Sequence, residues 1–409
     1  MRFVLALIVA VMTATSALAA TDCSDTSALV RQFYDDAGLN RLSEQPWFRD
    51  CVHRELREDR VWNTLEDYAI TARNLGQDIV SVTPNYDVVR VDFSGLSLAF
   101  LLSRDRNRQV IGVDGLQTSA IGLQFSELAS RFKRLPGQTS LLLTRNGRDL
   151  ISHNADLPLQ VSSSMKLGIL QVLLSDIAAG RLKLTDTAEL KPEFKNLPSG
   201  TLQQFPNGSM LTLDTLAALM MRDSDNTAAD VLINRLGADR VAAALGMPFI
   251  MSFHQWFMMK GDRALYDRFR SGDQAARAKL LKELQPQIPL YYGDTFVQAT
   301  PAAGWHMPAR KLCDLAKGVA ASGLTQLANT FVEFSEWRSI ASKAGGDETS
   351  RNDTILATRI DGEQFCLSMT WNTEASIDND QRYVFLLTSL MEAIRRYDAR
   401  LGKVALIPH

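Results

Sequence analysis

The sequence predicts an α+β protein of 409 residues, in which an antiparallel sheet is flanked by a helical domain and preceded by a small α+β domain. Two turn signals, Asn146-Gly147 and Asp361-Gly362, each separate two runs of strand-forming residues and so indicate two β-hairpins. The chain between these hairpins has a mainly helical pattern. We therefore expect strands from both ends of this region to form one antiparallel sheet, with the helical insert packed beside it.

The first residues have the layout of a cleaved secretory signal. Arg2 precedes an apolar run from Phe3 to Met12, and small residues follow up to Ala19. The apolar run is shorter than the roughly 20 residues that a transmembrane helix needs. Residues 1–19 are therefore expected to be removed, and the product is expected to be secreted or periplasmic, with no insertion into a membrane.

Composition and charge give no reason to expect that the protein binds nucleic acid or an acidic membrane. With 46% hydrophobic and 22% charged residues, the chain is ordinary for a soluble globular protein. A formal net charge of −2 provides no electrostatic attraction to nucleic acid or to an acidic membrane surface. Neither partner is expected, and the sequence leaves the oligomeric state open.

The cysteines and histidines limit the covalent and metal chemistry. Cys23 and Cys51 lie near the start of the chain and Cys313 and Cys366 near its end, so one disulfide in each half is the simplest of three pairings. Buried free thiols are the alternative for the later pair. The five histidines are scattered without a metal-binding spacing, so neither a metal site nor another cofactor is expected.

Residues 20–122 are expected to form the small α+β domain. The pattern is mostly helical from Ser27 to Leu75, and from Asp87 to Val113 it changes to short alternating apolar runs. Aromatic residues such as Phe33, Tyr34, Phe93 and Phe100 are expected in its core. No catalytic constellation occurs in this part of the sequence.

Residues 123–409 are expected to form the larger domain. An amphipathic helix, FSELASRFKRL, is closed by Pro136-Gly137 and precedes the first hairpin. A final helix is expected from about Tyr383 to Leu401, after the second hairpin. The two hairpins therefore lie between terminal helices and enclose the helical insert.

A lysine inside an apolar helix points to chemistry. The stretch SMKLGILQVLLSDIAAG is apolar on nearly every face, which indicates a buried helix that ends at Gly180. Ser163 and Lys166 are three residues apart and so lie on one face of that helix. A partly desolvated lysine can take the proton of a serine hydroxyl and make it a nucleophile. Backbone N–H groups at the helix start can stabilise negative charge on an acyl oxygen.

Spacing alone is weak evidence, because the chain contains the same pattern twice. Ser130 and Lys133 repeat it on the amphipathic helix before Pro136. Their neighbours Arg131 and Arg134 indicate a solvated helix surface there. The first pair therefore needs support from other motifs.

Two further motifs follow in order along the chain. Ser224-Asp225-Asn226 precedes a helix, where Asp225 and Asn226 are also good N-cap residues. Lys343-Ala344-Gly345 ends an expected strand, although alone it is typical of a turn with a surface lysine. The order of the three motifs, with one hairpin before the first and another after the last, favours a shared site.

Together the motifs resemble the S-x-x-K, S-D-N and K-T-G set of class A β-lactamases and penicillin-binding proteins. The resemblance covers roughly residue 125 to the C-terminus and implies the class A β-lactamase-like transpeptidase fold, a small-molecule substrate and no cofactor. It implies catalytic roles for Ser163 as the acylated nucleophile, Lys166 as its general base and Ser224 as the proton relay to the leaving group.

The resemblance also implies a set of substrate-binding residues. Asn226 is implied to bind the substrate amide and to orient Lys166, while Lys343 is implied to hold the substrate carboxylate, with Ala344 and Gly345 in the same motif. The family usually has threonine where this chain has Ala344, so one hydroxyl that helps to bind the carboxylate is missing.

A larger departure concerns hydrolysis of the acyl-enzyme. Class A β-lactamases carry an E-x-x-L-N motif whose glutamate activates the deacylating water, and none occurs between Gly237 and Thr300. Glu283 is the only glutamate in that stretch, and a helix surface is expected for it. The apolar segment Phe249 to Met259 is expected either to wall the pocket in place of the usual loop or to pack in the core.

The replaced loop and the extra N-terminal domain resemble the branch of the family exemplified by the esterase-like protein of the clavulanic acid cluster. In that branch the small domain is similar to the nuclear transport factor 2 or ketosteroid isomerase fold. We therefore expect an exported serine hydrolase that acts on a β-lactam or a related amide or ester. The alternatives are an esterase or DD-peptidase-like enzyme and a penicillin-binding sensor module that is acylated without turnover.

Overall fold

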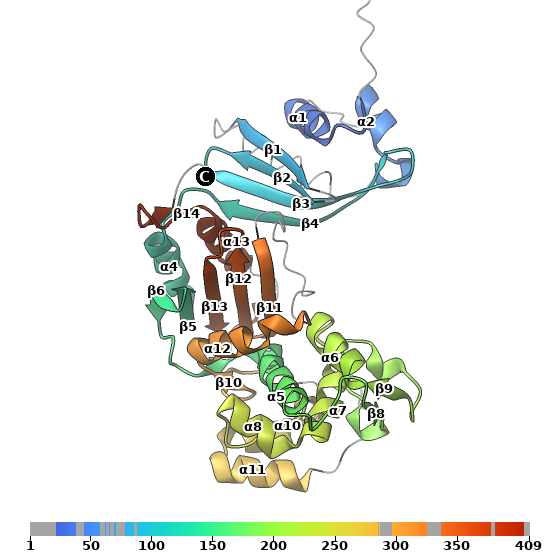
Figure 1. Ribbon diagram of the computed structural model, residues 1–409, viewed down its shortest axis with the longest axis vertical. Helices are drawn as coiled ribbons and strands as arrows, with labels where there is room; N and C mark the ends of the chain where they lie inside the picture. Colours follow the sequence, from blue (N-terminus) through green and yellow to red (C-terminus); the bar gives the residue numbers. More distant parts are fainter. Residues whose placement is uncertain are drawn as a thin grey trace, which may run out of the picture. The chain divides into compact units, whose positions relative to one another are not determined.

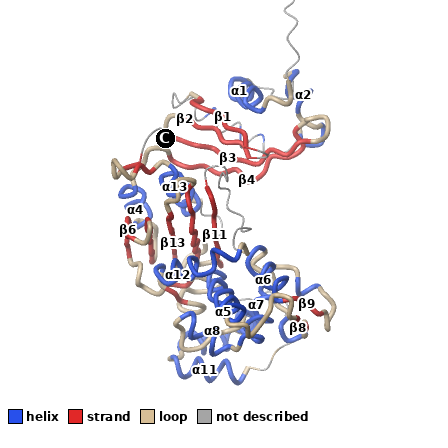
Figure 2. The backbone as a smooth tube through the Cα atoms, in the orientation of Figure 1, coloured by secondary structure: helices blue, strands red, loops and turns tan. Residues whose placement is uncertain are grey.

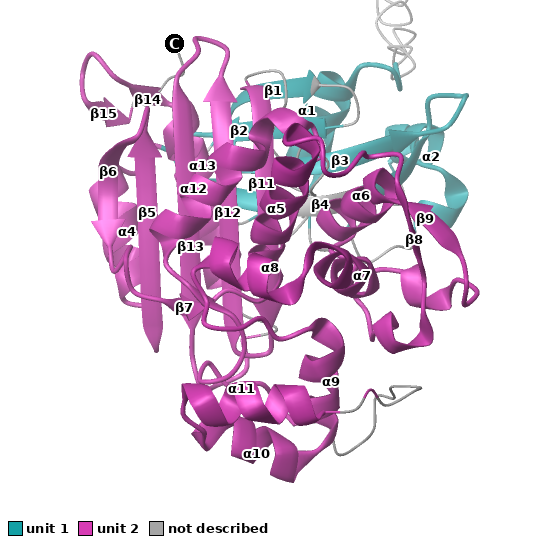
Figure 3. Cartoon of the chain, turned by 60° about the horizontal axis from the view of Figure 1, so that its bottom comes forward, with its two compact units in different colours: residues 1–121 teal, residues 122–409 magenta. Residues whose placement is uncertain are grey.

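The computed structural model of the chain divides into two compact units, residues 1–121 and 122–409 (Figure 3). No helix among the residues it describes is long and apolar enough to cross a membrane. The predicted signal segment, residues 1–19, lies outside those residues. The structure describes residues 22–37, 45–57, 62, 65, 69–70, 78–85, 88–284, 286, 297–324, 337–377 and 381–404.

The first unit contains helices followed by a four-stranded antiparallel meander (Figure 1). The strand at one edge, β1, was not predicted from the sequence. Its sequence, IVSVTPN, contains Pro84, which a strand tolerates at the edge of a sheet because no partner needs its N–H group there. The elements are α1 (Thr26–Asp36), α2 (Pro46–Cys51), η2 (Arg54–Leu56), β1 (Ile79–Asn85), β2 (Val88–Phe93), β3 (Leu96–Arg104) and β4 (Val110–Ala120).

Aromatic and aliphatic side chains fill the core of this unit, as predicted. Tyr34, Phe93 and Phe100 are buried, and Phe33 packs against the cluster. Trp47, Phe48 and Trp62 complete the aromatic part of the core. The aromatic residues of this unit therefore serve packing.

The second unit is built on a five-stranded antiparallel sheet with the order β11-β12-β13-β5-β6 (Figure 1). Its strands are drawn in red in Figure 2. Both predicted hairpins are confirmed, and strands from the two ends of the unit meet where β13 pairs with β5. The first turn has positive φ angles at Asn146 (48°) and Gly147 (80°), which suits a two-residue hairpin turn. The strands are β5 (Gln138–Arg145), β6 (Arg148–His153), β11 (Trp337–Asp347), β12 (Ser350–Arg359) and β13 (Gln364–Asn372).

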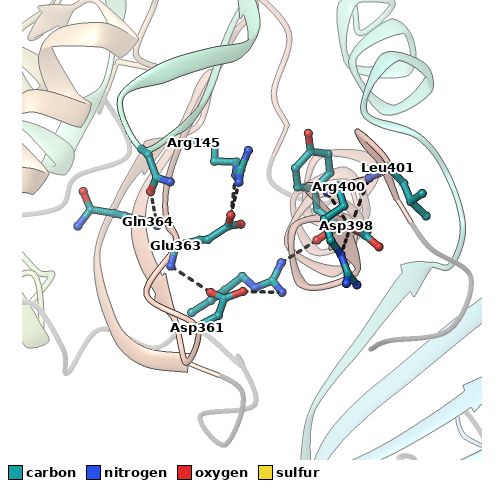
Figure 4. Close-up of polar contacts among 10 residues, drawn as sticks. Arg145, Asp361, Glu363, Gln364, Asp398, Arg400 and Leu401 are labelled. Carbon is teal, nitrogen blue, oxygen red and sulfur yellow. Dashed lines mark hydrogen bonds and ion pairs between the residues drawn. The ribbon is translucent and has the colours of Figure 1, made fainter.

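The turns of the two hairpins contact each other although they are far apart in the sequence (Figure 4). The backbone N–H of Asn146 donates to the carbonyl of Gln364, and the N–H of Gln364 donates to Oδ1 of Asn146, at 2.7 and 2.9 Å. Arg145 forms an ion pair with Glu363 beside them. These contacts fix the register of the central strand pair.

Helices cover both faces of the sheet. On one face α4 (Phe125–Lys133) and α13 (Arg382–Arg395) share a core with sheet residues such as Trp371. On the other face α12 (Ala309–Val319) belongs to the core of the helical insert. The predicted α+β class, with an antiparallel sheet flanked by a helical domain, is confirmed.

The last helix is shorter than predicted. It ends at Arg395 instead of continuing to Leu401, because Tyr397–Asp398 (β14) turns back to pair with Lys403–Val404 (β15). The Asp398 carboxylate accepts the backbone N–H groups of Arg400 and Leu401 in the connecting turn (Figure 4). Local capping of this turn therefore outweighs continuation of the helix.

The helical insert is organised around α5, which is buried on nearly all sides, as predicted. A Cβ atom on Gly168 would lie 2.3 Å from Cδ2 of Leu245, so α5 and α8 approach closely at this glycine. The helical elements are η3 (Ser162–Met165), α5 (Lys166–Ala178), η4 (Pro192–Phe194), η5 (Leu202–Gln204), α6 (Leu213–Arg222), α7 (Asn226–Leu236), α8 (Ala238–Leu245), α9 (Phe253–Gly261), α10 (Arg263–Ser271), α11 (Gln274–Glu283) and η6 (Ala320–Ser322). Short strand pairs join β8 (Thr187–Glu189) to β9 (Met210–Thr212) and β7 (Leu159–Gln160) to β10 (His306–Met307).

The four cysteines form one disulfide in each unit. Cys23 is bonded to Cys51, and Cys313 is bonded to Cys366. This confirms the simplest pairing and excludes free thiols for the later pair. The second bond joins α12 to the central strand β13 and so ties the helical insert to the sheet.

Removing the second disulfide is expected to destabilise the second unit by about 4 kcal/mol, because the bond closes a loop between residues 53 apart and restricts the unfolded chain. The measurement is urea unfolding of a Cys313→Ala/Cys366→Ala double variant, followed by tryptophan fluorescence and circular dichroism. A Cys23→Ala/Cys51→Ala variant, which keeps only the second disulfide, serves as the control and should show the same loss in its second unit when dithiothreitol is added. An unchanged free energy of unfolding would contradict the expectation.

Candidate active site

The hydroxyl of Ser163 lies beside the amine of Lys166 at the start of α5. Ser163 is in the short 3₁₀ helix η3, and the α-helix begins at Lys166. In a 3₁₀ turn, residues three apart are eclipsed, so their side chains point the same way. Lys166 Nζ is 3.1 Å from Ser163 Oγ. Ser163 is partly exposed, whereas Lys166 is fully buried.

The oxygen atoms around Lys166 suit a neutral amine. Nζ is 2.5 Å from the Ser224 carbonyl and 2.7 Å from Asn226 Oδ1, and both of these oxygens can only accept a hydrogen bond. The Asn226 amide nitrogen donates to the Leu197 carbonyl at 3.2 Å, which fixes the orientation of the amide. The two N–H bonds of a neutral amine satisfy the two acceptors, which leaves the lone pair for a hydroxyl group.

The electrostatic surroundings favour that neutral form. Burial is the main reason that the pKa of Lys166 is lowered well below its usual value, and the nearby charge of Lys343 lowers it further. The carboxylates of Asp225 and Asp230 act in the opposite direction. Lys166 is thus a candidate proton acceptor in contact with a partly exposed hydroxyl.

Of the three residues of the second motif, one caps a helix and two contact Lys166. Asp225 is the N-cap of α7, where its Oδ1 accepts the Ala228 N–H at 2.9 Å. Its Oδ2 accepts the N–H groups of Thr201 and Leu202, each at 2.8 Å. The capping interpretation therefore applies to Asp225, while its neighbours Ser224 and Asn226 contact Lys166.

Ser224 lies between two lysines. Its hydroxyl oxygen is 3.2 Å from Lys166 Nζ and 3.0 Å from Lys343 Nζ. Its backbone has a φ of 53°, in the left-handed region that serine rarely adopts. Such a conformation persists only where the surroundings enforce it, and here it directs the carbonyl and the hydroxyl to the same amine.

The third motif brings β11 against Ser163. Lys343 is buried, and burial lowers its pKa to about 8. A Cβ atom on Gly345 would lie 2.2 Å from the Val161 carbonyl and 2.6 Å from the Ser163 nitrogen. Only glycine permits this approach of the strand to η3, whereas Ala344 is exposed at the surface. The structure thus brings together Ser163, Lys166, Ser224, Asn226, Lys343 and Gly345.

The sequence analysis did not predict the residues that fix the backbone next to Ser163. Ser162 has a φ of 45°, and its hydroxyl donates to Asp347 at 3.1 Å and lies 3.0 Å from the Ser350 hydroxyl. Asp347 also accepts the side-chain amide of Gln160. Asp347 and Ser350 lie at the tip of the β11–β12 hairpin, and no sequence spacing relates them to Ser163.

A second missed residue, Phe253, covers the amine of Lys166. The centre of its ring lies 4.2 Å from Lys166 Nζ. The surrounding segment is mostly core, since Trp256, Met258 and Met259 are buried. Of the two interpretations of this segment, core packing holds for most of it, and Phe253 alone is seen to contact a predicted site residue.

The other sequence patterns lie on the surface. Ser130 and Lys133 are exposed on α4, where Ser130 accepts a hydrogen bond from Arg134. Glu283 is at the exposed end of α11, 3.8 Å from Lys279. Both surface predictions are confirmed. Within the described part of the chain, no three His, Cys, Asp or Glu residues are grouped to hold a metal ion.

The motif geometry and the sheet between two helical layers match the arrangement that the resemblance to serine hydrolases implies. Residues 124–286 match the model of the β-lactamase enzyme family. This match supports the likeness of the second unit to the serine hydrolase superfamily of the class A β-lactamases and penicillin-binding proteins, which the three motifs predicted. The likeness of the first unit to the nuclear transport factor 2 fold stays a prediction.

The individual relatives share little sequence identity with this chain. β-Lactamase VEB-1 from Pseudomonas aeruginosa is 30% identical over 99 residues, which is 24% of this chain and 33% of VEB-1. A β-lactamase from Sphaerobacter thermophilus DSM 20745 has 18% identity and a TM-score of 0.48, over 66% of this chain and 98% of that one. PBP-A has 17% identity and a TM-score of 0.45, over 65% of this chain and 92% of its own.

The two site lysines are expected to titrate below the surface lysines. Lys343 should lose its charge with a midpoint near pH 8, so an anion that it holds should bind more weakly above that pH. Lys166 should likewise titrate well below the usual lysine value of about 10.4. The measurement is NMR titration of ¹⁵N-labelled lysine amines, assigned with Lys166→Arg and Lys343→Arg variants. Midpoints at the usual lysine value of about 10.4 would contradict the expectation.

Proposed function

We propose that this protein is an exported serine hydrolase that forms an acyl-enzyme on Ser163, with a β-lactam or a related amide or ester as substrate. The observation that carries the proposal is the contact of the buried Lys166 amine with the partly exposed Ser163 hydroxyl at 3.1 Å. A general base must lie within hydrogen-bond reach of the proton that it removes, and Lys166 meets this condition.

In the proposed acylation step, the Lys166 amine takes the hydroxyl proton as Ser163 Oγ bonds to the substrate carbonyl carbon. The negative charge that develops on the carbonyl oxygen is stabilised by backbone N–H groups at the start of the helix. The bond from the carbonyl carbon to the leaving atom then breaks. Ser224 gives its proton to the leaving atom and receives one from Lys166, which returns Lys166 to the neutral amine.

The remaining residues bind the substrate in this scheme. Asn226 offers its amide to the substrate side chain and keeps Lys166 in place through the 2.7 Å contact. Lys343 holds a substrate carboxylate while it is charged, below about pH 8. Ala344 adds no hydroxyl to that contact, which favours substrates in which the carboxylate contributes less to binding.

Deacylation is the slow step in this proposal. Within the described residues no carboxylate is hydrogen-bonded to Ser163 or Lys166, which supports a site without a carboxylate base for the deacylating water. This observation favours an esterase or DD-peptidase-like activity, or a penicillin-binding sensor that keeps its acyl group, as the second candidate function. Lys166 is the base available for hydrolysis.

Export is supported by the disulfides and by the apolar N-terminal run. Disulfide bonds such as Cys23–Cys51 persist in secreted and periplasmic compartments. The similarity to VEB-1, a β-lactamase, supports a β-lactam as the first substrate class to test.

Mixing the protein with a reporter cephalosporin is expected to add the mass of one acyl group, which intact-mass spectrometry detects. The adduct should be absent in Ser163→Ala and present in Ser130→Ala, the matched variant of the second S-x-x-K pattern. Loss of the adduct with time, together with product release, indicates turnover, and a permanent adduct indicates the sensor function. No adduct with any β-lactam or ester would overturn the acyl-enzyme proposal.

Replacing Lys166 by alanine is expected to slow acylation by at least ~10²-fold, as the loss of a general base does. Lys133→Ala removes the exposed lysine of the second pattern and should leave the rate unchanged. The rate is measured by quenching the reaction at intervals and weighing the protein, with circular dichroism to verify folding. Unchanged acylation in folded Lys166→Ala would show that Lys166 is not the base.

A further inference from the structure

The three motifs do not explain why the aromatic ring of Phe253 lies against the amine of Lys166. Phe253 lies on α9, about ninety residues along the chain from the amine that it covers, and only 3% of its surface is exposed. A phenylalanine in a core usually faces other apolar groups. Here its ring centre is 4.2 Å from Nζ, well within the distance of about 6 Å at which a cation is attracted to an aromatic face.

Two anchors hold the ring in that position. The Asp230 carboxylate accepts the backbone N–H groups of Phe253 and His254, each at 2.8 Å, and so fixes the first turn of α9. Asp230 is four residues after Asn226 on α7, so one face of that helix places both the amide and the ring around Lys166. Behind Phe253, the ring of Trp305 packs at 4.6 Å between centroids.

The second anchor also connects the ring to the nucleophile. The Trp305 carbonyl accepts the N–H of Val161 at 2.9 Å, two residues before Ser163. Trp305 Nε1 donates to the carbonyl of Met251, just before α9, at 2.9 Å. The segments that carry Phe253 and Ser163 are thus both bonded to one tryptophan, which limits the movement of the ring relative to the site.

Apart from the ring, a positive charge on Lys166 is stabilised by neutral oxygen atoms of Ser163, Ser224 and Asn226, and no carboxylate among the described residues is hydrogen-bonded to it. The charged groups that act on it are Lys343 on β11, which opposes the ammonium form, and Asp225 and Asp230 on α7, which favour it. The Asp225 oxygens accept backbone N–H groups, and the Asp230 oxygens accept backbone N–H groups and the Asn196 side-chain amide. Neither aspartate hydrogen-bonds to Lys166. Because Nζ is fully buried, water does not solvate it.

We propose that Phe253 is a positioning residue for Lys166, whose ring face stabilises the ammonium group formed when Lys166 takes the proton of Ser163 and excludes water from it. The attraction between ring and cation is strongest when both are desolvated, as they are here. The ring cannot accept a proton, so the proton on Lys166 leaves only through the hydroxyls that contact it, Ser163 and Ser224. This inference rests on the proposed acylation of Ser163.

The test compares Phe253→Leu, which keeps an apolar side chain but removes the ring face, with Phe253→Tyr, which restores the ring. The matched control is Phe269→Leu, because Phe269 is equally buried on α10 and its ring lies near Arg277. The first readout is the Lys166 titration by ¹⁵N NMR. Phe253→Leu should lower the midpoint by about half to one pH unit, since it removes an interaction with the charged form only.

The second readout is the pH profile of acylation by the reporter cephalosporin. In Phe253→Leu the low-pH limb should move to lower pH by the same amount, and the plateau rate should fall about 3- to 10-fold because a weaker base removes the proton. Phe253→Tyr should restore both values, and Phe269→Leu should change neither. A merely structural role for Phe253 would lower the rate without moving the limb.

The two proposals fail in different ways. If no substrate acylates Ser163, the acyl-enzyme proposal fails, but the NMR titration still tests the role of the ring. If folded Phe253→Leu shows an unchanged or raised Lys166 midpoint, the role of Phe253 is overturned, whether or not Ser163 is acylated.

Discussion

The burial of one lysine amine is the constraint on which the rest of the site depends. A charged amine in a dry interior is costly unless partners stabilise it, and lysine commonly responds by losing its proton. Lys166 has no exposed surface, and oxygen atoms from Ser163, Ser224 and Asn226 surround it. The same desolvation that opposes stability lowers the pKa of Lys166, which supports its proposed role as the base.

Much of the fold of the second unit can be understood as the means of building that environment. The helix α7 supplies Asn226 and the carboxylate that anchors α9, the left-handed Ser224 directs two oxygen atoms at one amine, and Gly345 lets β11 approach η3. The Cys313–Cys366 disulfide joins the sheet to the helical insert that contributes the first two groups. Sheet and insert therefore meet at the amine, and neither part alone forms the site.

The aromatic ring next to Lys166 has a chemical consequence. A carboxylate can both stabilise an ammonium group and accept a proton from water, whereas a ring face can only do the first. A site with Phe253 over its lysine therefore separates acylation from hydrolysis more strongly than a site with two bases does. This separation suits an enzyme whose acyl group is passed on slowly, or a protein whose acylated form is itself the signal.

The sequence by itself determined the secondary-structure pattern of the second unit, both hairpins, the buried helix and the three motifs, because periodicity, turn residues and short spacings are local properties. It could distinguish the pair Ser163 and Lys166 from the copy at Ser130 and Lys133 by the charges beside the second pair. Only the tertiary structure decided that Phe253, Asp230 and Asp347 support the site, and that the last helix stops at Arg395. These facts depend on contacts between segments far apart in the chain, and on φ angles such as that of Ser224, which packing imposes against the residue's own preference.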